Sequence, residues 1–337
     1  MIGVDLGGTN VRAGAFFEDG TPAGEHFQNP SHGQEGTAKV IDAISKTIRQ
    51  AVDSAKEKPL AVGMAIPGHI DDAKGVVRWA PNFGETVDGV FKNWYDVPVR
   101  DLLKETIDLD IHMDNDANMA ALGEYRFGLG RNSAKCLVML TVGTGIGGGV
   151  ILSPDAVLGD ARGPMVMVGG NKGGAELGHV VISYQGLDCR SGEYGAIEGY
   201  CGRDSIIQRA LHRINRGRDS AITELVKGDL GAITPLTISQ AALAGDDVAI
   251  EVWEEVGTML GVAIGNYINI FAPDVLAIGG NIARAGDLLL KPAIKAARNI
   301  AVKSLFQDAK VAVAEQIEDA GMLGGVGLAL EALKWSR

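Results

Sequence analysis

Val4-Asp5-Leu6-Gly7-Gly8-Thr9-Asn10 stands at the start of the chain, where an apolar strand runs into a glycine-rich turn. A second strand is expected over residues 11–17, so the turn joins a hairpin. The pattern restarts at residues 137–142, which lead into Gly143-Thr144-Gly145 and a second apolar run over residues 150–152. We interpret this repetition as an internal duplication: two α/β domains, each opening with a hairpin whose turn faces a shared cleft.

Further elements follow from hydrophobic periodicity and turn residues. The pattern predicts helices over residues 37–56, 100–106, 117–127, 203–214, 238–243 and 247–271, the last one capped by Asp246 or Asp247. It predicts strands over residues 60–66, 111–113, 275–278 and 311–314. A final helix over residues 321–335 is expected to return to the first domain. The predicted division is residues 1–115 plus 321–337 for the N-terminal domain and 116–320 for the C-terminal domain.

Composition limits the possible partners. The 337 residues carry a formal net charge of −11, which disfavours nucleic acid and anionic lipid as ligands. The beginning of the chain lacks the features of a signal peptide, and the uncharged run 256–273 contains several glycines and asparagines, which favours a buried helix over a membrane span. Three cysteines are too few for a disulfide scaffold, and Cys136 lies in an apolar run typical of a core. We therefore expect a cytoplasmic protein without membrane partners.

The glycine turns are candidates for binding phosphate. Gly143-x-Gly145-x-x-Gly148 matches the dinucleotide fingerprint, but the next residues predict a strand instead of the required helix, and the chain has no P-loop motif. Successive backbone N–H groups at glycines can instead form a concave anion site. The side chains expected to assist are the hydroxyls of Thr9 and Thr144 and the Asp5 carboxylate, which could hold Mg²⁺ through water. The alternative is that these turns belong to two ordinary hairpins that bind no ligand. The similar turn at Gly279-Gly280, after another predicted strand, argues against this alternative.

Asp114-Asn115-Asp116-Ala117-Asn118 follows a predicted strand and precedes a predicted helix. Asp116 could simply cap that helix. However, α/β enzymes place catalytic groups at strand ends that face a cleft, and a carboxylate there can accept the proton of a sugar hydroxyl.

Glu176, His179 and Glu198 form a third group of polar residues. Carboxylates and a histidine suit a polyol, because each sugar hydroxyl both donates and accepts hydrogen bonds. A structural role for His179 and metal ligation by it both remain open at this point.

Together these motifs resemble the ROK family (repressor, open reading frame, kinase) of sugar kinases and regulators, from residue 2 to about residue 333. The matching segments, in chain order, are Asp5-Leu6-Gly7-Gly8-Thr9-Asn10-x-Arg12, Gly63-Met64-Ala65-Ile66-Pro67-Gly68, Pro81-Asn82, residues 115–124, residues 143–149, Glu176-x-Gly178-His179 and Glu198.

The resemblance implies a two-domain actin-like ATPase (ribonuclease H-like) fold, Mg-ATP in an interdomain cleft, domain closure over the sugar, and a homodimer. The residues expected at the nucleotide are Asp5, Gly7, Gly8, Thr9, Asn10, Arg12, Thr144, Gly145, Gly279 and Gly280. The residues expected at the sugar are Gly68, Asn82, Asn115, Asp116, Glu176, His179 and Glu198, with Asp116 as the catalytic base.

The chain departs from the family pattern in two places. Members of the family usually bind a structural zinc through the motif histidine and three cysteines, but only Cys189 is retained here, with Ser191 and Ala196 at the other positions. Because alanine has no ligand atom and Cys201 fits the pattern poorly, we expect no zinc. The segments 82–97 and 152–174 also look longer than usual and lie beside sugar motifs, as does His69, so they are candidates for shaping specificity.

These features predict an ATP-dependent sugar kinase. The segment 123–131 resembles the glucokinases of the family, which favours glucose phosphorylated at O6, while fructose, mannose, N-acetylglucosamine and N-acetylmannosamine stay open as acceptors. A non-catalytic, sugar-sensing regulator is the alternative from another class. Regulators carry a helix-turn-helix domain before the first phosphate motif, for which the start at Asp5 leaves no room.

Overall fold

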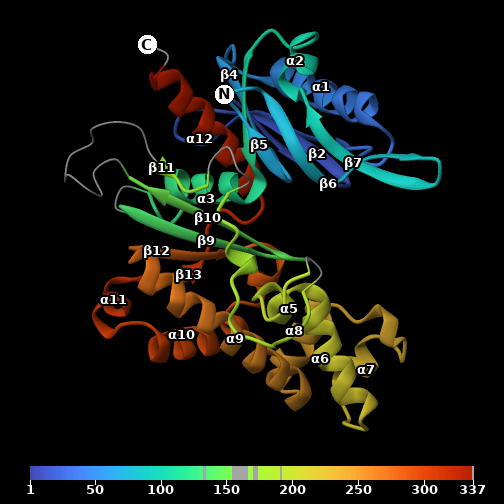
Figure 1. The fold of residues 1–337 in the computed structure, drawn as a ribbon, viewed down its shortest axis with the longest axis vertical. Helices are drawn as coiled ribbons and strands as arrows, with labels where there is room; N and C mark the ends of the chain where they lie inside the picture. Colours follow the sequence, from blue (N-terminus) through green and yellow to red (C-terminus); the bar gives the residue numbers. More distant parts are fainter. Residues whose placement is uncertain (132–133, 154–165, 170–173, 190–191, 336–337) are drawn as a thin grey trace. The chain divides into compact units, whose positions relative to one another are not determined.

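The computed structural model describes residues 1–131, 134–153, 166–169, 174–189 and 192–335. By their contacts the residues form two compact units (Figure 1). Unit 1 comprises Met1–Leu137, Gly149–Ala175 and Glu315–Arg337, and unit 2 comprises Val138–Gly148 and Glu176–Ala314. The contacts place the helix after Asn115 in unit 1, whereas the sequence-based division placed it in the second domain. The predicted domains themselves stay a prediction.

Unit 1 is built on a five-stranded sheet in the order β3-β2-β1-β4-β8. The strands are β1 (Ile2–Leu6), β2 (Asn10–Phe16), β3 (Pro22–Pro30), β4 (Ala61–Ile66) and β8 (Asp110–Asn115). The three strands β1, β4 and β8 run parallel, while β2 pairs antiparallel with β1 and β3 pairs antiparallel with β2. Because parallel strands end at the same edge of a sheet, the ends of β1, β4 and β8 bring Asp5, Ile66 and Asn115 to one side of unit 1.

Helices cover this sheet. They are α1 (Thr37–Ser54), α2 (Val99–Lys104), α3 (Asp116–Phe127) and α12 (Ala320–Trp335). Helix α1 buries Val40, Ile44 and Ile48, the residues whose spacing predicted it, in a core shared with the strands. Helix α12, red in Figure 1, packs on β1, β4 and α3, which confirms that the last helix returns to the first part of the chain.

Unit 1 also contains a small sheet that the sequence pattern did not predict. Strands β5 (His69–Asp71), β6 (Val76–Val87) and β7 (Val90–Val97) form an antiparallel sheet in that order. Segment 82–97, which looked longer than usual, therefore forms the end of β6, the turn after it and all of β7. Most of the other long segment, 152–174, lies outside the described residues.

The second five-stranded sheet has the order β11-β10-β9-β12-β13, the same order as the first when its strands are numbered along the chain. Its strands are β9 (Cys136–Val142), β10 (Ile146–Leu152), β11 (Val166–Met167), β12 (Val275–Gly279) and β13 (Lys310–Val313). In both sheets the first strand of the repeat lies in the middle. The second and third strands follow on one side of it, and the fourth and fifth strands follow on the other side. The internal duplication inferred from the repeated glycine turns is thereby confirmed.

Most of the remaining described residues of unit 2 are helical. Its helices are α5 (Glu198–Cys201), α6 (Arg203–Asn215), α7 (Ala221–Leu225), α8 (Pro235–Leu243), α9 (Asp247–Phe271), α10 (Asp287–Ile300) and α11 (Lys303–Asp308), with short 3₁₀ turns at Leu177–His179, Leu230–Ala232 and Asn281–Ala285. Asp246 caps α9 by accepting the Ala249 N–H at 2.8 Å. Among the described residues, no helix has both the length and the apolarity needed to cross a bilayer.

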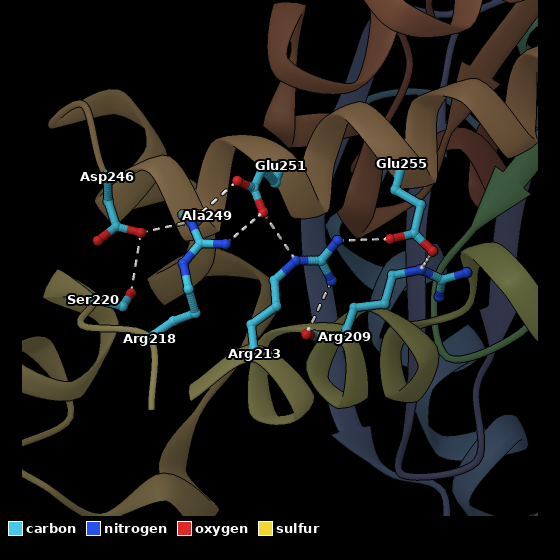
Figure 2. A network of polar contacts seen from close by, with 8 residues as sticks. All are labelled: Arg209, Arg213, Arg218, Ser220, Asp246, Ala249, Glu251 and Glu255. Carbon is cyan, nitrogen blue, oxygen red and sulfur yellow. Dashed lines mark hydrogen bonds and ion pairs between the residues drawn. The ribbon is translucent and has the colours of Figure 1, made fainter. Parts of the chain in front are cut away.

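Two features hold α9 in place. Gly257, Gly261 and Gly265 follow one stripe of α9, and a side chain at any of them would meet α10, so glycine allows the two helices to approach closely. On another side, arginines of α6 and the following turn pair with Glu251 and Glu255 (Figure 2). Glu255 accepts from Arg209 at 2.8 Å and from Arg213 at 2.9 Å. A network in which each carboxylate has two guanidinium partners has a better defined geometry than an isolated surface pair.

Candidate functional site

In unit 1 the first glycine turn closes the β1–β2 hairpin. The Gly7 N–H donates to the Asn10 carbonyl at 2.8 Å, and the Ser31 N–H donates to the Thr9 carbonyl at 2.9 Å. Gly8 and Thr9 are exposed at the tip. A Cβ added at Gly8 would meet nothing within 4 Å, so the packing of the chain does not demand glycine there. The open space suits a ligand that approaches the backbone closely, as predicted for phosphate.

Asp5 and Arg12, both predicted to act at the nucleotide, lie opposite each other on β1 and β2. The Arg12 guanidinium donates to Asp5 Oδ2 at 2.6 Å and to the Glu318 carbonyl at 2.6 Å. Because a carboxylate has about four lone-pair positions, this pairing leaves Asp5 capacity to accept from water. Asp5 therefore fits the predicted role of holding Mg²⁺ through water, with Arg12 fixing its orientation.

Asn82, one of the predicted sugar residues of unit 1, lies near this turn. Asn82 lies in a bulge of β6, where the register against β7 shifts between Ala80 and Gly84, and its φ of +64° is in the left-handed region. A Cβ added at Gly33 would lie 3.0 Å from the Gly8 carbonyl and 3.1 Å from the Asn82 carbonyl. The backbones of the phosphate turn and of the bulge that carries Asn82 thus both pack against the same glycine.

Gly68 and the catalytic segment are joined directly. Gly68 has a φ of +102°, and a Cβ there would collide with the Trp79 carbonyl, so both its conformation and its packing require glycine. Its own carbonyl accepts the Asn115 side-chain amide at 3.0 Å. His69 lies next to it, with its ring edge against Trp79 at 5.5 Å between centroids.

The cap of α3 is Asn115, so the alternative role of Asp116 as the helix cap is wrong. Asn115 has an extended ψ of 141°, and its side chain accepts from Ala117 N at 2.9 Å and from Asn118 N at 3.2 Å. Asp116 is instead the first helical residue and is exposed. The preceding strand is buried, so Asp116 lies where the chain emerges from the sheet at the N-terminus of a helix.

Asp114 was not predicted to have a role, but it is a buried carboxyl group two residues from Asp116. Burial, with a smaller contribution from the Asp72 charge, raises its pKa from 3.8 to about 6 against the opposing hydrogen bonds from Asn115 N and the Asn118 amide. The Asn118 Oδ1 atom is also buried and has no hydrogen-bond partner among the residues that the structure describes. The segment that carries Asp116 is therefore supported by a polar layer under α3.

In unit 2 the second glycine turn is closed by a hydrogen bond from Gly143 N to the Gly145 carbonyl at 2.9 Å. Glu198 lies against this turn, because its Oε2 accepts the Ile146 N–H at 2.9 Å. A Cβ at Gly145 would collide with the same carboxylate. The glycine at 145 is thus already required by Glu198, a reason that sequence reasoning missed when it attributed this glycine to phosphate alone.

The glycines at the end of β12 are explained by packing too. Gly280 has a φ of +79°, and a Cβ there would collide with the backbone of Val142 on β9. A Cβ at Gly279 would collide with the side chain of Met139. Their predicted contact with the nucleotide stays a prediction.

Glu176 directly precedes the 3₁₀ turn Leu177–His179, and His179 is the last residue of that turn. A Cβ at Gly178 would collide with the Ile146 carbonyl, and the buried hydroxyl of Tyr267 donates to the Leu177 carbonyl, so this turn is held against β10 and α9. His179 Nε2 lies 3.7 Å from Glu176 Oε2. Within unit 2 the fold therefore gathers the second glycine turn and all three predicted sugar residues, Glu176, His179 and Glu198, around Ile146.

The residues present do not fit the zinc site of the family. Ala196 is buried and offers no ligand atom, and Ser191 lies outside the described residues. Cys201 is fully buried in α5, where its thiol contacts the Val256 carbonyl at 3.4 Å and burial raises its pKa to about 12. Glu193, which was missed when only cysteine positions were compared, lies with Cys189 and His179 such that their ligand atoms are within 4.8 Å of one another.

The sequence matches the ROK family over residues 1–332, and the chain belongs to this family. It is 33% identical to a glucokinase of Thermotoga maritima over 98% of this chain and 97% of that protein. Its structure is similar to that of a ROK family glucokinase from Streptomyces griseus in complex with glucose and AMPPNP, with a TM-score of 0.77, 30% identity and coverage of 98% of both chains.

A ROK family transcriptional regulator, a homologue of the E. coli MLC protein, has a TM-score of 0.83 at 23% identity, with 99% of this chain and 78% of the regulator covered. That likeness concerns the fold alone. The fold is the actin-like ATPase fold that the resemblance implied, with its two duplicated sheets, and the chain is an ATP-dependent sugar kinase by class.

Proposed function

We propose that the protein transfers the γ-phosphate of ATP to O6 of glucose, with Asp116 as the general base. The observation that carries this proposal is the position of Asp116, exposed at the start of α3 while the neighbouring Asn115 supplies the cap. Asp116 Oδ1 also accepts the Ala117 N–H at 2.9 Å, but Asn115 accepts that same N–H as well as the Asn118 N–H, so the cap does not depend on the Asp116 carboxylate. The glucokinase named among the relatives and the glucose-bound neighbour support glucose as the acceptor.

In the proposed reaction, Asp116 accepts the proton of the sugar hydroxyl as its oxygen attacks the γ-phosphorus. The new O–P bond forms in line with the bond to the β–γ bridging oxygen, which breaks and releases ADP. Backbone N–H groups at the two glycine turns and the hydroxyls of Thr9 and Thr144 hold the phosphate oxygens. When bound near Asp5, Mg²⁺ neutralises charge on the β- and γ-phosphates.

Amide, carboxylate and imidazole side chains are proposed to bind the sugar. Asn82 and Asn115 of unit 1 are proposed to bind ring hydroxyls, with the Gly68 carbonyl fixing the Asn115 amide. Glu176, His179 and Glu198 of unit 2 are proposed to bind the remaining hydroxyls. Both Glu198 oxygens already accept one hydrogen bond each, yet a carboxylate can accept about four, which leaves capacity for a sugar.

Replacing Asp116 with Asn tests the proposal. The side chain keeps its size and Asn115 still caps α3, so the fold and glucose binding should persist while kcat falls by roughly 10²- to 10⁴-fold. The kcat is measured by coupled ADP release and glucose binding by calorimetry. Asp287→Asn is the matched control, since Asp287 is also an exposed aspartate in the first turn of a helix, α10, and its replacement should leave kcat unchanged. A near-normal kcat for Asp116→Asn would contradict the assignment.

Substrate choice is tested separately with a panel of glucose, fructose, mannose, N-acetylglucosamine and N-acetylmannosamine. We expect the highest kcat/KM for glucose. A higher value for another sugar would keep the kinase and change its acceptor, whereas binding of a sugar without turnover of any would favour a sugar-sensing role. The proposed homodimer and cytoplasmic location are independent of these assays.

A further inference from the structure

The first turn of α12 lies against the carboxylate of Asp5. A Cβ added at Gly321 would lie 2.7 Å from Asp5 Cγ and 2.8 Å from Asp5 Oδ1, and the three nearest atoms all belong to Asp5. Two carbon atoms in good contact are about 3.5–4.0 Å apart, so a side chain at residue 321 would displace this carboxylate. Glycine at residue 321 is therefore required by one side chain, the one proposed to hold Mg²⁺ through water.

The backbone of α12 is fixed at this end of the helix. A Cβ at Gly3 of β1 would collide with the Met322 carbonyl, and a Cβ at Gly63 of β4 would collide with the backbone of Gly325. The helix thus packs directly on both strands. Gly3 and Asp5 are two residues apart on β1, so their side-chain positions face the same side of the sheet, the side on which α12 packs. Of the groups at this contact, the Asp5 carboxylate is the one that can turn aside.

The two carboxylate oxygens of Asp5 have different surroundings. Oδ2 accepts from the Arg12 guanidinium at 2.6 Å, and the same guanidinium donates to the Glu318 carbonyl shortly before α12 begins. Oδ1 lies beside Gly321 and accepts no hydrogen bond among the residues that the structure describes. Oδ1 is thus the oxygen whose lone pairs are available to a water molecule of a hydrated Mg²⁺ ion.

We propose that Gly321 is a positioning residue for Mg²⁺: because it carries no side chain, the first turn of α12 fixes the place of Asp5 Oδ1 and, through it, the place of the hydrated ion. The inference rests on the proposed function, in which Asp5 holds Mg²⁺ through water. A methyl group at residue 321 should turn the carboxylate and strain its pairing with Arg12, since the helix itself is fixed on β1 and β4. Groups that orient a metal-binding side chain commonly change metal affinity by about 10- to 100-fold when they are altered.

Calorimetric titration of the full chain with AMPPNP, once with excess Mg²⁺ and once with EDTA, measures how much the ion tightens nucleotide binding. In Gly321→Ala this gain should fall by about tenfold or more, while the affinity in EDTA stays at the wild-type value. The Mg²⁺ concentration that gives half-maximal kcat should rise, and the KM for glucose should not change. Asp5→Asn should lose the same gain, and adding Gly321→Ala to it should cause no further loss, because residue 321 acts through Asp5.

Gly324→Ala and Gly327→Ala are the matched controls. Both add one methyl group to α12, and at Gly324 the methyl meets the backbone of α3, which disturbs the packing of the helix. Asp5 is not among the nearest neighbours of either glycine. The gain from Mg²⁺ should therefore stay at the wild-type value in both variants, whereas a merely structural role for Gly321 predicts an equal loss in Gly324→Ala.

Circular dichroism checks that each variant is folded. If Gly321→Ala does not fold, adding Asp5→Ala removes the carboxylate that the methyl meets and should restore folding; a double variant that stays unfolded would overturn the proposal. An equal loss in Gly324→Ala, or a further loss when Gly321→Ala is added to Asp5→Asn, would overturn it too. An unchanged gain in Gly321→Ala beside a lost gain in Asp5→Asn would overturn this inference and leave the role of Asp5 in the proposed function intact. A wild-type protein whose AMPPNP affinity does not depend on Mg²⁺ would overturn both.

Discussion

Helix α12 packs closely on the rest of unit 1. We expect replacement with alanine to affect stability differently at two of its glycines, Gly324 and Gly327, which lie one turn apart. A Cβ at Gly324 would collide with the carbonyl oxygen of Met119 on α3. A Cβ at Gly327 would first meet Arg126 Cδ at 3.0 Å, in a flexible side chain that can turn aside. Both glycines lie inside α12, so Gly324→Ala and Gly327→Ala change the same intrinsic helix propensity.

The magnitudes follow from two terms. Alanine is favoured over glycine in a helix interior by about 1 kcal/mol, and this gain applies at both positions. At Gly324 the added methyl meets the backbone of a packed helix, which cannot rotate away, so overpacking of about 1–3 kcal/mol or more opposes the gain. We expect Gly327→Ala to be neutral or stabilising. Because the gain in helix propensity is common to both variants, Gly324→Ala should be less stable than Gly327→Ala by the overpacking term alone, about 1–3 kcal/mol or more.

Hydrogen exchange measured by mass spectrometry is the suitable assay, because a chain with two compact units need not unfold in one step. In Gly324→Ala, peptides from α12, α3 and β4 should exchange faster than in the wild type, while peptides from α9 in unit 2 should not change. In Gly327→Ala all of these peptides should exchange at the wild-type rate or more slowly. Equal slowing of exchange in both variants would refute the view that α12 packs on α3 through backbone contact at Gly324.

Two further predictions concern buried carboxylates of unit 1. Because the folded state raises the pKa of Asp114 to about 6, it binds more protons than the unfolded state between pH 4 and 6, so Asp114 lowers stability as pH rises through that range. Asp114→Asn should reduce this fall in stability and raise the free energy of unfolding at pH 7.5 by up to about 3 kcal/mol. Urea denaturation at pH 4 and at pH 7.5 measures the fall, and an unchanged fall in the variant would contradict this prediction. Glu124 is fully buried and accepts the N–H groups of Leu129, Glu315 and Gln316, each at 2.9 Å. Glu124→Gln loses one charged acceptor and should destabilise unit 1 by about 2–3 kcal/mol, seen as faster exchange near residue 315; exchange at the wild-type rate there would show that the anchor is dispensable.

Local signals predicted the long elements well. Helix α9 begins and ends at the predicted residues, because its apolar period is unbroken and Asp246 caps it. The duplicated hairpins were also predicted, since each combines an apolar strand with a glycine turn. The sheet β5-β6-β7 was missed because its longest strand contains Pro81 and a register shift between Ala80 and Gly84, which interrupt the pattern expected of a strand. Which of two adjacent polar residues caps α3 was missed for a similar reason: backbone conformation at Asn115, not residue type, decides it.

The candidate site was predicted as separate motifs, and the structure changes how those motifs depend on one another. Glu198 was expected at the sugar and Gly145 at the phosphates, yet the Glu198 carboxylate occupies the space that a side chain at 145 would need. One of its oxygens accepts the Ile146 N–H, and the other contacts the Cys189 thiol. A single carboxylate thus links the second glycine turn to the loop that carries Cys189. A displacement of the Cys189 side chain therefore reaches Glu198 directly, and Glu198 in turn contacts the turn that is proposed to hold phosphate.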